Sequence, residues 1–324
     1  MPIRRRCPGR WMGERYYNKD VNKKMGIWFI FMSIYLLFPQ VVKANGCLKI
    51  AVPAYFYPPS SLSAADYWYK VINTLKPGEI AIYNPSNGPG TSKNSNYQNV
   101  INQAKVKGVN PMGYVYTSYG ARSAAAVKSD IDLHYNWYGT TSIFLDEVSG
   151  STAYIPYYQD LYNYVKARGG VLMINPGTIP AEGYVNVADH VVVFESAYSS
   201  YMSTSFPDWI SKYPADKFVH LVYKTPQASL SNVLTKARNS NAGMIYVTDD
   251  DLPNPWDTMP PYWQTEVDDT CTVVPPTIPV PTTVPGDLNG DTHVNNTDYQ
   301  LIIANFGHPY TIFDYNLVIG NWGR

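Results

Sequence analysis

Carboxylates end two of the apolar runs in this sequence, and they are the side chains best suited to chemistry. Asp146 and Glu147 follow the run 142–145, and Glu195 follows the run 190–194. An ionised carboxylate loses much hydration when it is buried, so acids at the end of a buried strand favour a working site. Hydrolysis of a glycosidic bond needs two such groups, because one protonates the leaving oxygen while the other attacks carbon or activates water.

Eight short runs with strand character lie between residues 48 and 250. Most are continuously apolar, which is typical of strands buried on both faces in a parallel sheet. Eight βα units in about 225 residues predict an α/β fold of the (β/α)8 TIM-barrel type. A doubly wound open sheet is the alternative, but no Gly-x-Gly-x-x-Gly follows the first strand. The predicted strands are 48–54, 79–83, 111–116, 142–146, 171–175, 190–194, 217–223 and 243–247, and the helix-like stretches between them include 96–107, 121–135, 155–167 and 230–240.

In such a barrel, functional residues collect at the carboxyl ends of the strands. Strands four and six are two steps apart, about 10 Å at the usual strand spacing. Carboxylates reaching inward from these two exits would come to about 5–9 Å, which covers both retaining and inverting glycosidases. The alternative is that the acids are structural and accept loop amide hydrogens or pair with Arg122. The residues that we expect to bind substrate are Tyr55, Asn84, Tyr116, Asn175, Tyr223 and Trp256.

The first 44 residues are typical of a secretory signal peptide. They hold nine basic and two acidic side chains, and their apolar run at 25–38 is short for a membrane span. Ala44 ends a segment that fits a cleavage site, with small or moderate residues at the −3 and −1 positions. We therefore predict a secreted, extracellular protein, with an uncleaved N-terminal anchor as the alternative.

Two cysteines remain once the predicted signal peptide is removed, and export implies an oxidising compartment. Cys47 and Cys271 lie at the two ends of the predicted barrel domain, which spans 45–271. A barrel brings its two chain ends to the same bottom face, so the two thiols should lie near each other. We expect a disulfide between them, and two unrelated thiols are the alternative.

The charge and the aromatic content of the chain indicate which class of molecule it binds. Beyond residue 44 the chain carries 16 basic and 23 acidic side chains, a net charge of −7, which argues against nucleic acid. Its 29 tyrosines suit sugar rings, since Tyr offers a flat apolar face with a polar tip, although ordinary packing accounts for most of them. No nucleophile elbow, Cys-x-x-Cys pair or zinc helix appears, so we expect catalysis without a cofactor.

Segment 272–285 is rich in Pro, Thr and Val and predicts an extended linker before a small module at 286–324. The module opens with oxygen-bearing side chains at the spacing of an EF-hand calcium loop, because Ca²⁺ takes many hard oxygen ligands. Thr292 and Asp298 replace the usual Gly and Glu at positions 6 and 12, and a polar turn without metal is the alternative. The predicted Ca²⁺ ligands are Asp287, Asn289, Asp291, the carbonyl of His293, and Asp298.

The same module contains a repeat. Residues 298–307 recur at 314–323, which predicts two similar short helices that bury each other's apolar faces. This segment resembles a dockerin-type module, but with one calcium loop, because residues 308–310 read His-Pro-Tyr where the second loop would stand. The resemblance implies a cohesin-like partner, or an intramolecular one if the missing loop prevents cohesin binding.

Six motifs in order across residues 50–260 resemble the spherulin-4-like proteins of glycoside hydrolase family 135. They read VPAYFYP at 52–58, NP at 84–85 with GPG at 88–90, GYVYT at 113–117, IFLDE at 143–147, NPG at 175–177 and VFE at 193–195. The resemblance implies a (β/α)8 barrel that hydrolyses α-1,4-linked N-acetylgalactosamine in secreted polysaccharides such as galactosaminogalactan. It also implies that Asp146, Glu147 and Glu195 form the family's acidic cluster.

From these residues we expect an endo-acting glycoside hydrolase. Glu195 is the candidate general acid, and Asp146 is the candidate nucleophile or cation stabiliser, with Glu147 as its rival. Whether the enzyme retains or inverts stays open at this point. The alternative functions are a non-catalytic protein that binds extracellular polysaccharide with the same barrel, and a calcium-dependent assembly protein in which the barrel is a spacer.

Overall fold

The computed structural model describes residues 47–271, 285–289, 291, 293–307 and 310–323. The predicted signal peptide at 1–44 and nearly all of the predicted linker lie outside the described residues. Among the helices of the described part, none is long and apolar enough to cross a membrane.

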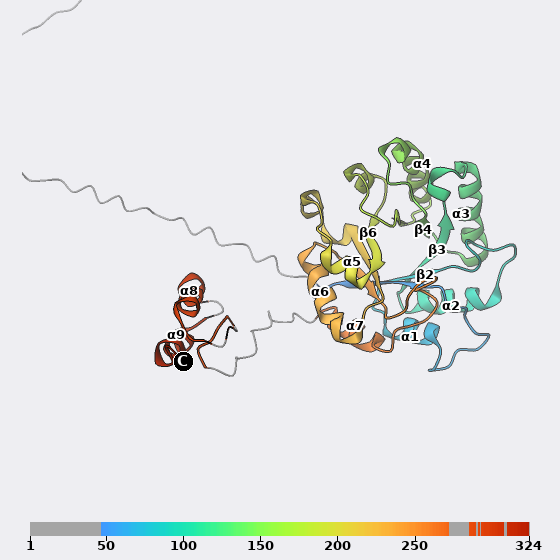
Figure 1. The fold of residues 1–324 in the computed structure, drawn as a ribbon. Coiled ribbons are helices and arrows are strands. Elements are labelled where there is room, and N and C mark those ends of the chain that lie inside the picture. The colour runs from blue at the N-terminus through green and yellow to red at the C-terminus, as the bar shows by residue number, and fades with distance from the viewer. Residues whose placement is uncertain (1–46, 272–284, 290, 292, 308–309, 324) are drawn as a thin grey trace, which may run out of the picture. The chain divides into compact units, whose positions relative to one another are not determined.

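Eight parallel strands form a closed barrel in sequence order, and β1 pairs with β8 to complete it (Figure 1). The predicted (β/α)8 fold is therefore confirmed. The strands are β1 (Lys49–Ala54), β2 (Ile80–Tyr83), β3 (Asn110–Tyr116), β4 (Ser142–Asp146), β5 (Leu172–Ile174), β6 (His190–Ala197), β7 (Phe218–Tyr223) and β8 (Met244–Val247).

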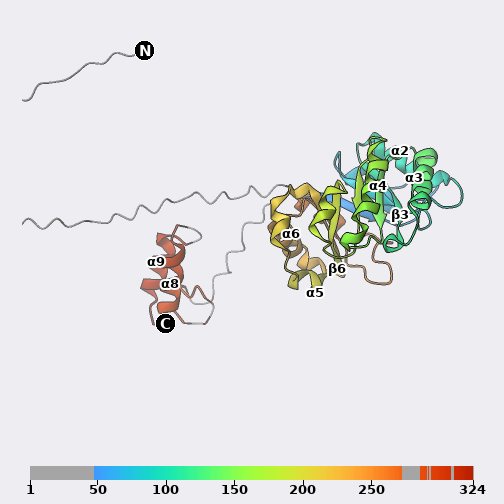
Figure 2. The ribbon, with the colours of Figure 1, turned by 90° about the horizontal axis from the view of Figure 1, so that it is seen from above.

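Helices surround these strands in both views of the barrel (Figures 1 and 2). The connection from β5 to β6 differs from an ideal βα unit, because it carries a 3₁₀ turn, η3 (Glu182–Asn186), in place of an α-helix. The other barrel helices are α1 (Tyr67–Thr74), α2 (Ser95–Val106), α3 (Ala124–Tyr138), α4 (Ile155–Lys166), α5 (Tyr198–Ser203), α6 (Leu230–Asn239) and α7 (Trp263–Asp269), with 3₁₀ turns η1 (Ser118–Gly120), η2 (Thr152–Tyr154), η4 (Asp208–Lys212), η5 (Ala215–Lys217) and η6 (Gln227–Ser229).

Strand β6 departs from the sequence prediction in a way that matters for the site. It runs three residues past Phe194, so Glu195 lies inside the strand and not at its exit. Its pairing with β7 shifts between Val192 and Phe194, which is a β-bulge. Val192 is in register with Val219, and Phe194 with His220, so the residue between them is the extra one.

Helix α3 packs unusually close to β3. A side chain at Gly113 would collide with the ring of His134, so the absence of a Cβ permits this contact. The imidazole Nε2 of His134 donates to the carbonyl oxygen of Tyr114, 2.9 Å away, and Nδ1 lies 3.0 Å from the Tyr83 hydroxyl. Burial lowers the pKa of His134 to about 4, so this ring is a neutral support for the strand.

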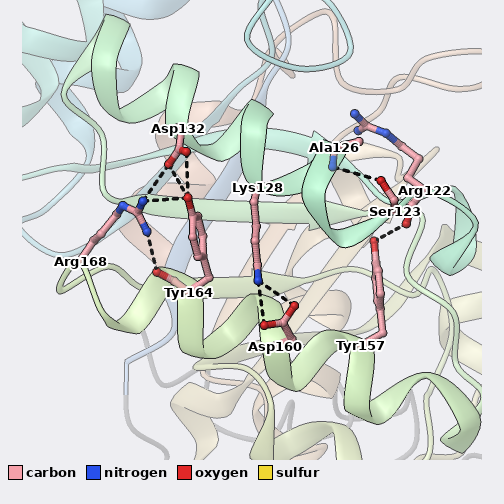
Figure 3. A network of polar contacts seen from close by, with 9 residues as sticks. All are labelled: Arg122, Ser123, Ala126, Lys128, Asp132, Tyr157, Asp160, Tyr164 and Arg168. Atoms are coloured by element: carbon pink, nitrogen blue, oxygen red, sulfur yellow. Dashed lines mark hydrogen bonds and ion pairs between the residues drawn. The ribbon is translucent and has the colours of Figure 1, made fainter.

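Helices α3 and α4 lie side by side in both ribbon views and are joined by polar contacts (Figures 1–3). Lys128 of α3 pairs with Asp160 of α4 at 2.8 Å. Arg168, just beyond α4, pairs with Asp132 at 2.9 Å. The hydroxyl of Tyr157 donates to the carbonyl oxygen of Arg122, which fastens the segment after β3 to α4 (Figure 3).

Cys47 and Cys271 form a disulfide with their Cα atoms 4.2 Å apart. Cys47 precedes β1 and Cys271 follows α7, so the bond joins the two ends of the barrel domain. Beside it, the amide of Leu48 donates to the carbonyl oxygen of Thr270 at 2.9 Å. The chain ends of the barrel are thus closed by a covalent bond and a backbone hydrogen bond at the face opposite the strand exits.

The C-terminal module contains α8 (Asn296–Asn305) and α9 (Ile312–Gly320). Its small core holds Val294, Ile302 and Val318, with Tyr299 and Tyr315 packed against it. This arrangement fits the two apolar helix faces that the repeat predicted.

Candidate active site

Asp146 and Glu195 come together inside the barrel mouth. Asp146 is the last residue of β4, and its carboxylate accepts a hydrogen bond at 2.8 Å from Tyr114 on the neighbouring strand β3. Glu195 reaches the same place from β6 because the bulge before Phe194 reverses the alternation of side chains. Phe194 consequently packs against Tyr201 of α5, outside the barrel, while Glu195 faces inward.

One side-chain amide joins the two carboxylates. Nδ2 of Asn175 lies 2.9 Å from Oδ1 of Asp146 and 2.5 Å from Oε2 of Glu195, so these two oxygens are at most about 5.4 Å apart. An amide nitrogen has two hydrogens, and each is aimed at one acid. Asn175 is 3% exposed, and the structure places its side-chain amide between the two carboxylates.

Glu195 holds a proton unusually well. Burial raises the pKa of Glu195 to about 7, and the charge of Asp146 acts in the same direction. Two donors oppose this rise, the amide of Asn175 and the indole N–H of Trp256, which is 3.2 Å from Oε1. At neutral pH a large share of Glu195 therefore carries a proton.

Asp146 is better solvated by its neighbours. Burial, with a smaller effect from the charge of Glu147, holds the pKa of its carboxyl above the ordinary value, and hydrogen bonds from the backbone N–H of Glu147, from Tyr114 and from Asn175 offset part of this rise. With a pKa of about 7, Glu195 is the acid of the pair better suited to hold a proton, while Asp146 is the acid whose ionised form receives three hydrogen bonds. Such a pair can supply a general acid and a carboxylate nucleophile.

Glu147, the third predicted acid, sits differently. Its backbone has φ +50°, in the left-handed region that residues other than glycine seldom occupy. Its carbonyl oxygen accepts hydrogen bonds from the Thr117 hydroxyl at 2.7 Å and from the Tyr119 amide at 2.6 Å. This turn aims the Glu147 amide at the Asp146 carboxylate, so the backbone of Glu147 contributes directly to the site.

Four of the residues expected to bind substrate are engaged with other protein groups. Trp256 is 6% exposed and its indole N–H is directed at Glu195, so it closes the back of the site. Tyr223 packs edge-on against Trp256, with ring centroids 6.1 Å apart. Asn84 accepts the amide hydrogen of Gly88 and thereby shapes its own loop. Tyr55 remains half-buried and packs edge-on against Tyr114.

Arg122 was the alternative partner for the acids, and it lies elsewhere. Its guanidinium pairs with Asp130 at 2.6 Å and stacks over the Tyr116 ring at 4.1 Å. It also donates to the Tyr116 carbonyl oxygen at 2.7 Å. The last of the six predicted substrate residues therefore has a cation on one face of its ring.

Tyr114 is a site residue that no pattern in the sequence singled out. It stands in the GYVYT motif two residues before Tyr116, and strand periodicity places the two on the same side of β3. A tyrosine at i−2 from a predicted exit residue is the signal that could have found it.

Three of the five predicted calcium ligands in the C-terminal module lie close together. Carboxylate oxygens of Asp287, Asp291 and Asp298 all lie within 4.8 Å of one another. Oδ1 of Asp298 accepts amide hydrogens from Leu288 at 2.7 Å and from Asn289 at 3.1 Å, so the loop already wraps around this carboxylate. Clustered hard oxygens in a wrapped loop are a donor set that fits Ca²⁺.

Comparison with known proteins agrees with this architecture. Residues 49–270 match the family described as spherulation-specific family 4. Spherulin-4 of Physarum polycephalum is 33% identical over 246 residues, which cover 69% of this chain and 72% of that protein. The crystal structure of Aspergillus clavatus Sph3, solved in complex with GalNAc, has a similar fold, with a TM-score of 0.61, 23% identity, and coverage of 70% of this chain and 98% of that one. The chain belongs to spherulation-specific family 4.

Proposed function

We propose that this protein is a retaining glycoside hydrolase that uses Glu195 as general acid/base and Asp146 as nucleophile. The observation that carries the proposal is the Asn175 amide between the two carboxylates, which keeps their nearest oxygens within about 5.4 Å. Retaining glycosidases hold their acids about 5–5.5 Å apart, whereas inverting enzymes need about 6.5–9.5 Å to admit a water molecule.

In the first step a carboxylate oxygen of Asp146 attacks the anomeric carbon while the bond to the leaving sugar breaks. Glu195 gives its proton to the leaving oxygen, which departs as a hydroxyl group. Asp146 becomes a neutral ester in this step. The repulsion that raises the pKa of Glu195 is thereby removed, so the residue becomes better suited to stay ionised and act as a base.

In the second step water attacks the same anomeric carbon from the opposite side. Glu195 takes the proton of the water, the ester bond breaks, and the Asp146 carboxylate is restored. Two inversions give net retention of configuration. Glu147 is the less favoured nucleophile, because Asp146 is the acid that shares a hydrogen-bond donor with Glu195.

For the substrate we propose an α-1,4-linked polysaccharide of N-acetylgalactosamine or galactosamine, cut within the chain. Membership of the family supports this choice, as does the GalNAc bound to Sph3. The disulfide between Cys47 and Cys271 suits a secreted enzyme acting outside the cell. The clustered carboxylates of the C-terminal module support a structural Ca²⁺ there, with a cohesin-like or intramolecular partner as a further proposal.

The direct test is the release of reducing ends from an α-1,4-linked galactosaminan. We expect release by the wild type, little by Glu195→Gln or Asp146→Asn, and normal release by Glu182→Gln, whose side chain is exposed and bonds to Tyr213 on the barrel's outer layer. Full activity in both active-site variants would refute the assignment of these acids. Binding of intact polymer without cleavage would point to a polysaccharide-binding protein instead.

Retention needs its own measurement. Proton NMR of the first product should show the α-anomer before mutarotation. Asp146→Ala with added azide should yield the β-glycosyl azide, because azide then replaces the missing carboxylate in a single inversion. An initial β-anomer from the wild type would establish an inverting enzyme.

A further inference from the structure

Three consecutive residues after β3 adopt left-handed backbone conformations. Ser118 has φ +45°, Tyr119 has φ +54° and Gly120 has φ +88°. Glycine tolerates this region, but a residue with a side chain is strained there by roughly 1–3 kcal/mol. A tyrosine in the middle of such a turn has a cost that its surroundings must offset.

Contacts from two directions fix the turn. The amide of Tyr119 donates to the carbonyl oxygen of Glu147 at 2.6 Å, and the amide of Gly120 donates to Thr117 at 3.1 Å. On the other side the ring of Tyr154 lies against Gly120, in the space that a Cβ atom would occupy. Two residues beyond the turn, the hydroxyl of Tyr157 donates a hydrogen bond to the carbonyl oxygen of Arg122, as Figure 3 shows.

This rigid turn leaves the Tyr119 side chain facing solvent. The residue is 62% exposed, whereas its main chain is bonded to Glu147, the residue that follows Asp146. Core packing therefore does not explain the choice of tyrosine at this strained position. The turn thus carries an exposed aromatic side chain on a backbone that is bonded to the residue after Asp146.

We propose that Tyr119 is a sugar-binding platform, on which one unit of the polysaccharide chain stacks outside the pair of carboxylates. The ring offers a flat apolar face to the C–H groups of a pyranose. A backbone that is already fixed reduces the entropy lost on binding. The inference rests on the proposed function. It adds a second sugar-binding subsite, which a polysaccharide chain can reach but a single sugar bound at the carboxylates cannot.

Tyr119→Gly is the most informative variant, because glycine keeps the left-handed turn and removes only the ring. Tyr119→Phe keeps the ring and removes the hydroxyl. The matched control is Tyr69→Ala, which removes a tyrosine that is 38% exposed on the outer helix α1. Affinity is measured for an α-1,4-linked galactosaminan and for monomeric GalNAc, in a Glu195→Gln background that prevents cleavage.

We expect Tyr119→Gly to weaken polymer binding by roughly 3- to 10-fold, in line with the usual strength of an aromatic contact, and to leave monomer binding unchanged. Tyr119→Phe and Tyr69→Ala should bind polymer like their parent. The midpoint of chemical denaturation should rise in Tyr119→Gly, since the strain is relieved, whereas a merely structural tyrosine would lower it when removed.

The outcomes separate this proposal from the proposed function. If the wild type cleaves polymer and Tyr119→Gly binds it as tightly as its parent, the platform is wrong and the hydrolase stands. If the wild type does not cleave but polymer binding depends on the ring, the platform stands and the hydrolase is wrong. Polymer binding that is absent in every variant overturns the platform.

Discussion

Tyr114 donates its hydroxyl hydrogen to Oδ2 of Asp146 across 2.8 Å, from the strand beside the one that carries the carboxylate. This bond favours the ionised acid, so it lowers the pKa that burial raises. The neutral imidazole of His134 supports the Tyr114 backbone from behind. A buried phenol is thus one of the donors that favour the ionised form of the proposed nucleophile.

Replacing Tyr114 by Phe should therefore shift the acidic limb of kcat/KM. Without its hydroxyl donor the pKa of Asp146 rises, so the carboxylate forms only at higher pH. A hydrogen bond to a charged group contributes about 1.5–3 kcal/mol, and we expect kcat/KM at the optimum to fall at least tenfold. Tyr162→Phe, which removes a tyrosine–aspartate bond on the outer layer, should change neither quantity. An acidic limb that does not move in Tyr114→Phe would contradict this role.

Asn175→Leu should affect the basic limb. Leucine has a similar volume but no donor, so both carboxylates lose the shared amide. Because that amide lowers the pKa of Glu195, its loss raises this pKa and moves the basic limb of kcat/KM to higher pH. We expect kcat to fall roughly 100-fold through the loss of positioning. Asn163→Leu on the surface of α4 is the control, and equal pH profiles for the two variants would contradict the prediction.

Glu195 should make stability depend on pH. In the native state the Glu195 carboxyl has a pKa of about 7, whereas the ordinary pKa of a glutamate carboxyl is 4.5. This contribution to stability is complete below about pH 4.5 and is lost as the pH rises through 7. Glutamine at this position cannot ionise. The difference in free energy of unfolding between Glu195→Gln and the wild type should therefore increase, in favour of the variant, by on the order of 2–3 kcal/mol from pH 5 to pH 8. Urea denaturation at the two pH values measures this difference, and parallel behaviour would refute it.

The disulfide should matter for stability and not for catalysis. It closes a loop of 224 residues, for which the chain-entropy model gives up to about 5 kcal/mol. We expect the Cys47→Ser, Cys271→Ser double variant to lose a few kcal/mol in chemical denaturation while kcat/KM at 25 °C stays within about twofold. A double variant with unchanged stability would show that the other contacts at this face suffice.

Removal of calcium should loosen the C-terminal module and spare the barrel. We expect EDTA to speed proteolytic cleavage within 285–323, while the rate of polymer hydrolysis stays constant. Asp298→Ala should abolish the response to Ca²⁺. Asp314→Ala is the matched control, because Asp314 occupies the equivalent place in the repeat, where it accepts a hydrogen bond from the Thr311 amide. Proteolysis that is insensitive to EDTA in the wild type would leave the loop as a polar turn.

The strands could be predicted well because their signal is local. A continuous apolar run reports burial on both faces without reference to the rest of the chain, and all eight runs became strands within a few residues of the predicted bounds. The acids at positions 146 and 195 were found for the same reason, because each follows such a run. The closeness of Cys47 and Cys271 could be predicted because a closed (β/α)8 barrel brings its two chain ends to the same face.

The parts that escaped prediction are long-range relationships. Trp256 lies 61 residues from Glu195, and no pattern in the sequence indicates that its indole N–H points at that acid. Asn175 was expected to bind substrate, and no pattern in the sequence indicates that its amide bridges the acids of two strands. Tyr119 gave no signal at all, since its conformation is set by the carbonyl oxygen of Glu147. Such features depend on which partners the fold brings within reach.

The bulge in β6 decides which of the following side chains face the inside of the barrel. If β6 kept all its residues but lost the bulge, its side chains would alternate strictly after Val192. Phe194 would then turn into the barrel and Glu195 would turn toward α5, although neither residue had been replaced. The direction of the proposed general acid therefore depends on the backbone irregularity before it as well as on the residue itself, and a regular strand with the same sequence would carry that acid on its outer face.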